Sequence, residues 1–162
     1  MLMRASWFPE MRRLSFSLLC LLPLLLVNEG AAAARTDNSA AVDARLDALY
    51  GSHQAYRDFL AALKYNVAHG DKARVAAMVA YPLTVRINGV KQRVKSPQRF
   101  LANYRSIMTP AIENAIRDQQ YENLFARDSG IMIGKQGEVW FSGICEKADC
   151  KAVRIKIIAI NN

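Results

Sequence analysis

The chain has 162 residues, with 22 lysines and arginines against 14 aspartates and glutamates, and a formal charge of +8. Because 52% of the residues are hydrophobic and 22% are charged, the composition is that of one folded domain, which excludes a disordered chain and a large multidomain enzyme. No run of about 20 apolar residues follows the first 30 positions, which excludes an integral membrane protein for the body of the chain.

Residues 1–34 have the pattern of an export signal. Arg12 and Arg13 precede the apolar run Leu14–Val27, and the small residues Ala31–Ala34 follow. This order is typical of a secretory signal peptide, and the run is too short for a membrane-spanning helix. We therefore expect a signal peptide over 1–34, with Met1 or Met11 as its start, and an exported, periplasmic single domain over 35–162.

The remaining domain stays basic after removal of the leader. Outside the inner membrane this charge suits an anionic envelope polymer, a lipid headgroup or an acidic protein, and not nucleic acid. A soluble surface that binds nothing is the alternative interpretation.

Helices are expected before most strands in the mature chain. Hydrophobic residues recur at helical spacing over 40–67, with Gly51-Ser52 as a break, and Asp71 caps a helix over 72–80. Ser96-Pro97 and Thr109-Pro110 begin helices over 97–108 and 111–119. Strands are expected over 83–87, 90–94, 123–127, 131–133, 138–145 and 150–160. This order predicts an α+β fold with a curved antiparallel sheet and N-terminal helices packed on one face.

Asn88-Gly89 is a strong signal for a hairpin with a two-residue turn. In the register that this turn sets, Arg86 opposes Lys91 and Arg93 lies on the same face. These three cations could meet an anionic partner. The alternative is a solvated strand edge that charge keeps soluble.

Cys145 and Cys150 are the two cysteines that remain after the leader is removed. An exported chain favours a disulfide between them, because disulfides persist outside the cytoplasm. A metal site would need further ligands, and the histidines His53 and His69 show no ligand spacing with the cysteines. If Cys145 opposes Cys150 across the last hairpin, Trp140 opposes Ile155 on the apolar face.

Several turn and core motifs resemble those of the NTF2-like, or cystatin-like, superfamily, and the resemblance runs from about Tyr56 to Ile160. The motifs are Ala68-His69-Gly70-Asp71, Ala80-Tyr81-Pro82-Leu83, Ile87-Asn88-Gly89, Ser96-Pro97-Gln98-Arg99-Phe100-Leu101 with Tyr104, Gly130-Ile131-Met132-Ile133-Gly134 and Gly137-Glu138-Val139-Trp140-Phe141. The chain is most similar to exported bacterial members of that superfamily without an assigned activity. The resemblance implies a cone in which helices and a bent sheet enclose a pocket, and a possible homodimer through the sheet face. Because this fold carries many functions, it does not select one.

His53 is the best candidate for a catalytic residue, since it falls on the apolar stripe of the helix expected to line the pocket. Tyr56 projects nearby, and Tyr104 and Trp140 complete the expected ligand-binding set. A buried neutral imidazole can act as a general base, but no acidic residue is expected beside His53, and a core histidine with one hydrogen bond is the alternative.

The sequence has no nucleophile motif, no phosphate-binding glycine loop and no metal-ligand spacing, so we expect no cofactor and no metal. Two functions remain. The first is an exported non-catalytic envelope protein that binds a small ligand or a protein partner through the pocket or the sheet face. The alternative is a small lyase or isomerase that uses His53 in the pocket as a general base, together with Tyr56 or Tyr104 as a catalytic residue.

Overall fold

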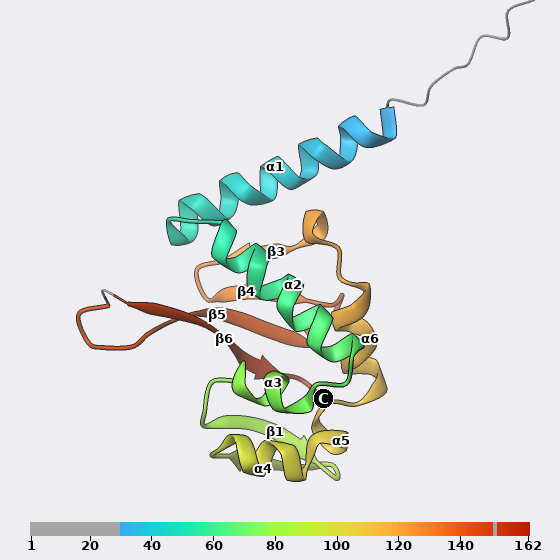
Figure 1. Cartoon of the computed structure of the whole chain (residues 1–162), viewed down its shortest axis with the longest axis vertical. Helices are drawn as coiled ribbons and strands as arrows, with labels where there is room; N and C mark the ends of the chain where they lie inside the picture. Colours follow the sequence, from blue (N-terminus) through green and yellow to red (C-terminus); the bar gives the residue numbers. More distant parts are fainter. Residues whose placement is uncertain (1–29, 151) are drawn as a thin grey trace, which may run out of the picture.

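The computed structural model describes residues 30–150 and 152–162 (Figure 1). Residues 1–29 of the expected signal peptide lie outside this range, and residues 30–34 form the start of the first helix. The signal peptide and its cleavage site therefore stay predictions.

Three helices come first: α1 (Gly30–Tyr50), α2 (Gln54–Ala68) and α3 (Lys72–Ala77). The expected break at Gly51-Ser52 is confirmed, and Gly51 has a positive φ of +79°, a backbone conformation that glycine adopts without strain. Asp71 caps α3 as expected, because its carboxylate accepts the backbone N–H of Arg74.

Helix α3 ends three residues before the expected position at Ala80. The chain leaves the helix there to run beside the last strand, where the backbone N–H of Ala80 donates to Ile157 over 2.8 Å. The N–H of Ile157 in turn donates to the carbonyl of Met78 over 2.9 Å. A long-range pairing thus replaces the last helical turn.

The hairpin that follows consists of β1 (Leu83–Ile87) and β2 (Val90–Val94). Its register is the predicted one, with Arg86 opposite Lys91 and Thr84 opposite Arg93. Asn88 and Gly89 both have positive φ, which is the conformation of a two-residue turn that matches the twist of the strands.

Three further helices follow the hairpin: α4 (Pro97–Ala102), α5 (Tyr104–Ile107) and α6 (Pro110–Asp118). Ser96 and Thr109 accept the backbone N–H groups that begin α4 and α6, as the Ser-Pro and Thr-Pro motifs predict. The single helix expected over 97–108 is interrupted at Asn103, whose backbone leaves the helical region.

The remainder is a four-stranded antiparallel sheet preceded by the short 3-10 helix η1 (Tyr121–Asn123). Its strands are β3 (Phe125–Arg127), β4 (Gly130–Ile133), β5 (Val139–Cys145) and β6 (Val153–Ile160), in the spatial order β3-β4-β5-β6. The hairpin β1–β2 forms a separate two-stranded sheet. The chain is therefore a mixed helix and sheet protein whose N-terminal helices precede antiparallel sheets, as expected.

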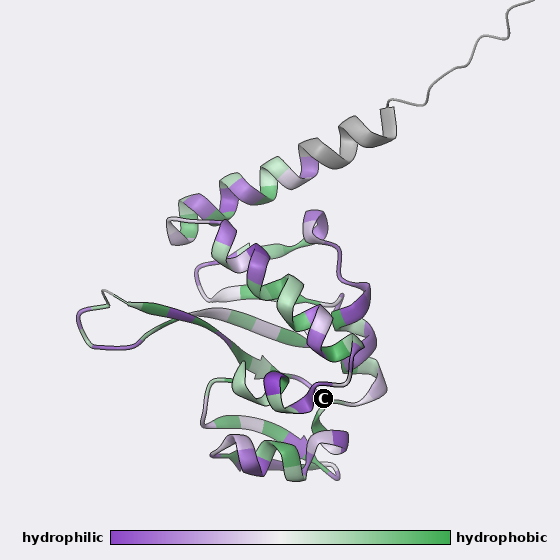
Figure 2. Ribbon diagram, in the orientation of Figure 1, coloured by the Kyte–Doolittle hydropathy of each residue, from purple (hydrophilic) through white to green (hydrophobic). Residues whose placement is uncertain are grey.

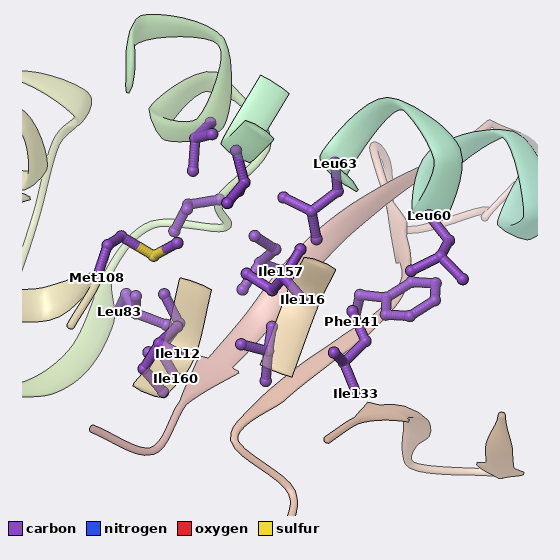
Figure 3. Close-up of a cluster of buried hydrophobic side chains, with 14 of the residues drawn as sticks. Leu60, Leu63, Leu83, Met108, Ile112, Ile116, Ile133, Phe141, Ile157 and Ile160 are labelled. Atoms are coloured by element: carbon purple, nitrogen blue, oxygen red, sulfur yellow. The ribbon is translucent and has the colours of Figure 1, made fainter. Parts of the chain in front are cut away.

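The hydrophobic core lies between α2, α6 and one face of the four-stranded sheet. Figure 3 shows Leu60 and Leu63 of α2 and Ile116 of α6 in one cluster with Phe141 and Ile157 of the sheet, and all five side chains are buried. β5 and β6 are largely hydrophobic along their length, whereas their connecting loop is hydrophilic (Figure 2). Side chains therefore fill the space between these helices and the sheet.

The predicted register of the last hairpin is wrong. Cys145 opposes Val153 instead of Cys150, and Trp140 opposes Ala159 instead of Ile155. The disulfide between Cys145 and Cys150 is present, but Cys150 lies in the connecting loop and not in β6. A short-range disulfide was therefore a poor guide to the pairing of the strands.

The register decides which aromatic residue enters the core. Phe141 is fully buried and stacks on Phe59 with ring centroids 5.1 Å apart. Trp140 lies on the opposite face of β5, where the guanidinium of Arg127 sits 5.1 Å from its ring centroid.

Candidate functional site

His53 lies in the junction between α1 and α2 and not on the apolar stripe where it was expected. It immediately precedes α2, and 32% of its side chain is exposed. Its backbone N–H donates to the carboxylate of Asp47 over 2.7 Å, and its Nδ1 lies 2.9 Å from both oxygens of that carboxylate. An acidic residue therefore orients the imidazole, contrary to expectation.

Asp43 forms the centre of a cluster on the other side of this imidazole. Its Oδ1 accepts the hydroxyl of Tyr121 over 2.7 Å and the Nη2 of Arg57 over 2.8 Å. The guanidinium of Arg57 lies 4.0 Å from the centroid of the Tyr121 ring. His53 Nε2 is 3.9 Å from Asp43 Oδ2, so both ring nitrogens of His53 face a carboxylate.

The ionisation of this cluster follows from its hydrogen bonds. Burial raises the pKa of Asp43, but the hydrogen bonds from Tyr121 and Arg57 outweigh it and hold the pKa below its ordinary value of 3.8. Burial and the bond to Asp43 raise the pKa of Tyr121 to about 12. Asp43 is therefore ionised and Tyr121 protonated at neutral pH, and together they connect α1 with α2 and η1.

Asp43 and Asp47 were not predicted as neighbours of His53. The two aspartates are four residues apart in α1 and therefore lie on the same side of that helix. The turn at Gly51 then brings His53 back beside them. The spacing was visible in the sequence, but the direction of the turn was not.

Tyr56 is buried and lies in an aromatic stack, away from the surface. Its ring is stacked on Tyr50 with centroids 4.7 Å apart and lies 6.4 Å from Phe141. Its hydroxyl packs so closely on Gly143 that a Cβ added there would be 2.9 Å away. Burial raises the pKa of Tyr56, and the phenol stays protonated at neutral pH.

Tyr104 and Trp140 lie elsewhere in the molecule. Tyr104 is buried in α5, where burial raises its pKa to about 12, and Lys72 lies 5.3 Å from its ring centroid. Trp140 lies on the outer face of the sheet, in contact with Phe125 and Arg127. The structure thus places these two residues away from His53 and from the Tyr56 stack, and it does not assemble the expected ligand-binding set.

The basic face of the β1–β2 hairpin is the other candidate, and here the structure agrees with the sequence. Arg86, Lys91 and Arg93 are exposed on the face that the register assigns to them. A groove of about 390 Å³ lies beside Arg86 and Lys91, and Thr84, Ile160 and Asn162 complete most of its lining. Within the described residues, no salt bridge involves any of the three cations.

The charge of this region extends well beyond the hairpin. Residues 72–112 contain eight lysines and arginines and no aspartate or glutamate, and all eight side chains are exposed. The cations are Lys72, Arg74, Arg86, Lys91, Arg93, Lys95, Arg99 and Arg105. They belong to the part of the molecule made of α3, β1, β2, α4 and α5, which lie together at the bottom of Figure 1. We call this part the basic lobe.

The lack of acidic residues over 72–112 is visible in the sequence, whereas the predicted basic face included only Arg86, Lys91 and Arg93. Asp71 caps the start of the lobe at α3 and pairs with Arg74 over 3.1 Å, whereas the other described acidic residues lie in α1, α2, η1, α6 and the loops around the four-stranded sheet. The molecule is therefore electrostatically asymmetric.

A second groove, of about 550 Å³, lies between α6 and the turn that connects β4 to β5. Gln119, Gln120, Asn123 and Gln136 supply amide groups to its wall, and Met132 supplies an apolar contact. Gln119 is already used, since its side-chain oxygen accepts the backbone N–H of Gly134 over 2.9 Å. This groove has fewer free hydrogen-bonding groups than its composition indicates.

Two further features are absent from the part of the chain that the structure describes. No cluster of three or more histidine, cysteine, aspartate or glutamate side chains is placed there to hold a metal ion. No helix in that part has the length and apolarity needed to cross a membrane.

Comparison of the chain with models of known protein families, with curated proteins and with solved structures finds no match. The geometry described above is therefore the basis for the functional inference.

Proposed function

We propose that this protein is an exported, non-catalytic binding module of the cell envelope that holds an anionic partner on its basic lobe. The observation that carries the proposal is the segment from Lys72 to Ile112, whose eight lysines and arginines are all exposed and which contains no acidic residue. Such a field attracts anions over distances of the order of 10 Å at moderate salt. The groove beside Arg86 and Lys91 supplies a place where the partner can enter.

Membership of the NTF2-like superfamily is part of this proposal, and its support is the turn and core motifs that resemble those of the superfamily. The order of N-terminal helices before antiparallel sheets is compatible with this assignment. The homodimer that the resemblance implies would use the outer sheet face, where Phe125, Met132 and Trp140 are neighbours across three strands. Export to the periplasm rests on the pattern of residues 1–34.

Charge reversal tests the binding function. We expect fluorescein-labelled poly-L-glutamate to bind the purified protein, and the triple variant R86E/K91E/R93E to bind at least about tenfold more weakly, because three attractive charges become repulsive. The measurement is fluorescence anisotropy at several salt concentrations.

The matched control is R45E/K135E/K147E, which changes the net charge equally at three exposed positions outside the basic lobe. It should lose much less affinity. Equal losses in the two variants would show that only net charge matters, and binding that survives the first variant would eliminate the proposal.

A second candidate function is the small lyase or isomerase with His53 as general base. The observation that favours it is the Asp47 carboxylate at 2.9 Å from Nδ1, because a carboxylate in that position orients a catalytic imidazole. The same carboxylate also fits a purely structural link, since Nε2 faces Asp43.

The variant His53→Ala separates the two roles. A catalytic His53 requires that the variant lose an activity found by screening small carbonyl compounds, while its thermal midpoint falls by no more than about two degrees. A large fall in the midpoint, measured by circular dichroism, would assign His53 to the structure of the α1–α2 junction.

A further inference from the structure

Strand β2 has one unpaired edge. It pairs with β1 along its whole length, and no other strand in the described parts of the chain pairs with it. The outer edge of a strand presents backbone N–H and C=O groups that can bind another extended chain.

The turn determines which residues of β2 present those groups. In a hairpin closed by a two-residue turn, the flanking pair Ile87 and Val90 is hydrogen-bonded, and the pairs alternate from there. Lys91 and Arg93 belong to the pairs in between, which are not hydrogen-bonded to each other. Their backbone N–H and C=O groups therefore point away from β1, to the open edge.

The opposite edge of the same hairpin confirms this alternation. Arg86 is the partner of Lys91, and its backbone N–H donates to Oδ1 of Asn162 over 2.9 Å. Its carbonyl accepts from Nδ2 of Asn162 over 2.6 Å. The side-chain amide of Asn162 thus occupies the outer edge of β1 in the way that a neighbouring strand would. Within the described residues, no hydrogen bond occupies the backbone groups of Lys91 and Arg93 at the outer edge of β2 in this way.

The side chains on this edge determine the charge of the strand that it can accept. Lys91 and Arg93 project from one face of β2, and a strand added at the edge would place its own side chains directly beside them on that face. A second copy of this chain paired through β2 would set cations against cations, which is unfavourable. An extended segment with acidic residues two positions apart would form two opposite-charge pairs.

We propose that the basic lobe binds an acidic polypeptide segment by β-strand addition at the edge of β2, with two of its acidic residues beside Lys91 and Arg93. This inference rests on the proposed function and specifies the chemistry of the partner. The backbone of Lys91 and Arg93 supplies the hydrogen bonds, and their side chains supply the selectivity for acidic residues.

Backbone methylation of a peptide separates strand addition from attraction by charge alone. The probe is an acetylated and amidated peptide of alternating glutamate and threonine. In the proposed complex the glutamates face Lys91 and Arg93 and exchange backbone hydrogen bonds with them, whereas the threonine N–H groups point away. We expect N-methylation of the glutamates to weaken binding at least about tenfold and N-methylation of the threonines to change it by less than about threefold.

Amide hydrogen exchange supplies a second measurement. The backbone N–H groups of Lys91 and Arg93 should become protected when the parent peptide binds, whereas the N–H of Gln92, which already faces β1, should change little. Unchanged exchange at Lys91 and Arg93 in the saturated complex would overturn the inference.

The other outcomes distinguish the inference from the proposed function. If both methylated peptides bind like the parent while R86E/K91E/R93E binds none of them, the partner is held by charge alone, and strand addition is wrong although the binding function stands. If vesicles that contain an anionic phospholipid bind and the peptide does not, the partner is a membrane surface. If neither the peptide nor poly-L-glutamate binds, the proposed function itself fails.

Discussion

Asp43 has the most connections of any acidic residue at the α1–α2 junction. It accepts hydrogen bonds from Arg57 and Tyr121 and lies 3.9 Å from His53 Nε2. Its bonding partners come from α2 and from η1, and η1 is distant in sequence. The carboxylate therefore ties three segments together, and its ionisation is linked to folding.

The depressed pKa of Asp43 predicts a pH dependence of the free energy of unfolding. A carboxylate with a lower pKa in the folded chain than in the unfolded one stabilises the fold above the unfolded value of about 4, and this contribution is lost as the pH falls through the folded value. Asp43→Asn should therefore lower the free energy of unfolding by about 1 kcal/mol near pH 7. The difference in free energy of unfolding between the variant and the natural protein should become smaller below about pH 4. Urea unfolding of both proteins at several pH values measures this difference.

Asp58→Asn is the control, because Asp58 is exposed on α2, where its carboxylate accepts a hydrogen bond from the side chain of Gln54. Its effect should be smaller than that of Asp43→Asn at neutral pH. A loss of unfolding free energy in Asp43→Asn that stays constant from pH 7 to pH 3 would contradict the lowered pKa of Asp43.

The residue scale also shows why a single histidine could not be interpreted from the sequence. Hydrophobic spacing placed His53 on the buried face of a long helix, but the break at Gly51-Ser52 removes it from that helix. The prediction of the break and the prediction of a buried His53 were therefore in conflict. The other histidine, His69, lies at the end of α2, where its Nδ1 is 2.8 Å from the carbonyl of Tyr65.

At the scale of elements, strand β5 gives the most instructive difference from expectation. Trp140 and Phe141 are adjacent, so one must face the core and the other must face outward. The register inferred from the disulfide placed Trp140 on the apolar face of the sheet. In the structure, Phe141 pairs with Ile157 and both lie in the core. A bulge between Trp140 and Phe141 shifts the pairing further.

This register predicts unequal effects of two neighbouring substitutions. Phe141→Ala should lower the free energy of unfolding by about 3–5 kcal/mol, because it leaves a cavity against Phe59. Trp140→Ala should cost about 1–2 kcal/mol, because its ring is only partly buried on the outer face. Equilibrium unfolding in urea measures both.

Phe141→Leu provides a milder variant if Phe141→Ala does not fold, with an expected loss of about 1 kcal/mol. A larger loss for Trp140→Ala than for Phe141→Ala would show that the register of β5 is the one inferred from the cysteines.

Positive charge is concentrated in one part of the whole molecule. Residues 72–112 carry eight cations and no acidic residue. Apart from Asp71, which caps α3 and pairs with Arg74, the described acidic residues lie in α1, α2, η1 and α6 and around the larger sheet. Like charges in one lobe repel each other and reduce its stability, so this arrangement has a cost for folding. Binding of a polyanion would relieve the repulsion, which is a physical reason to connect the charge of the lobe with function.

Folding also creates the edge on which the further inference depends. The β1–β2 hairpin is not continuous with the larger sheet, and Asn162 closes one of its edges while the other stays open. The end of the described chain is far from the hairpin in sequence, so this difference between the edges was not visible in the pattern of the hairpin itself.

Short-range features were determined by the sequence itself. The caps at Asp71, Ser96 and Thr109, the Asn88-Gly89 turn with its register, and the Cys145–Cys150 disulfide all join residues within a few positions of each other. Their geometry depends on local dihedral preferences and on single hydrogen bonds. The order of helices and strands follows for the same reason.

Only the tertiary structure decided the contacts between distant segments. The partners of His53, the register of β5 with β6 and the separate positions of Tyr56, Tyr104 and Trp140 depend on how whole elements pack. Many arrangements satisfy the same hydrophobic periodicity, and the buried area of the complete core selects among them. The composition determined how much positive charge the protein carries, and the fold determined that this charge lies beside an open strand edge.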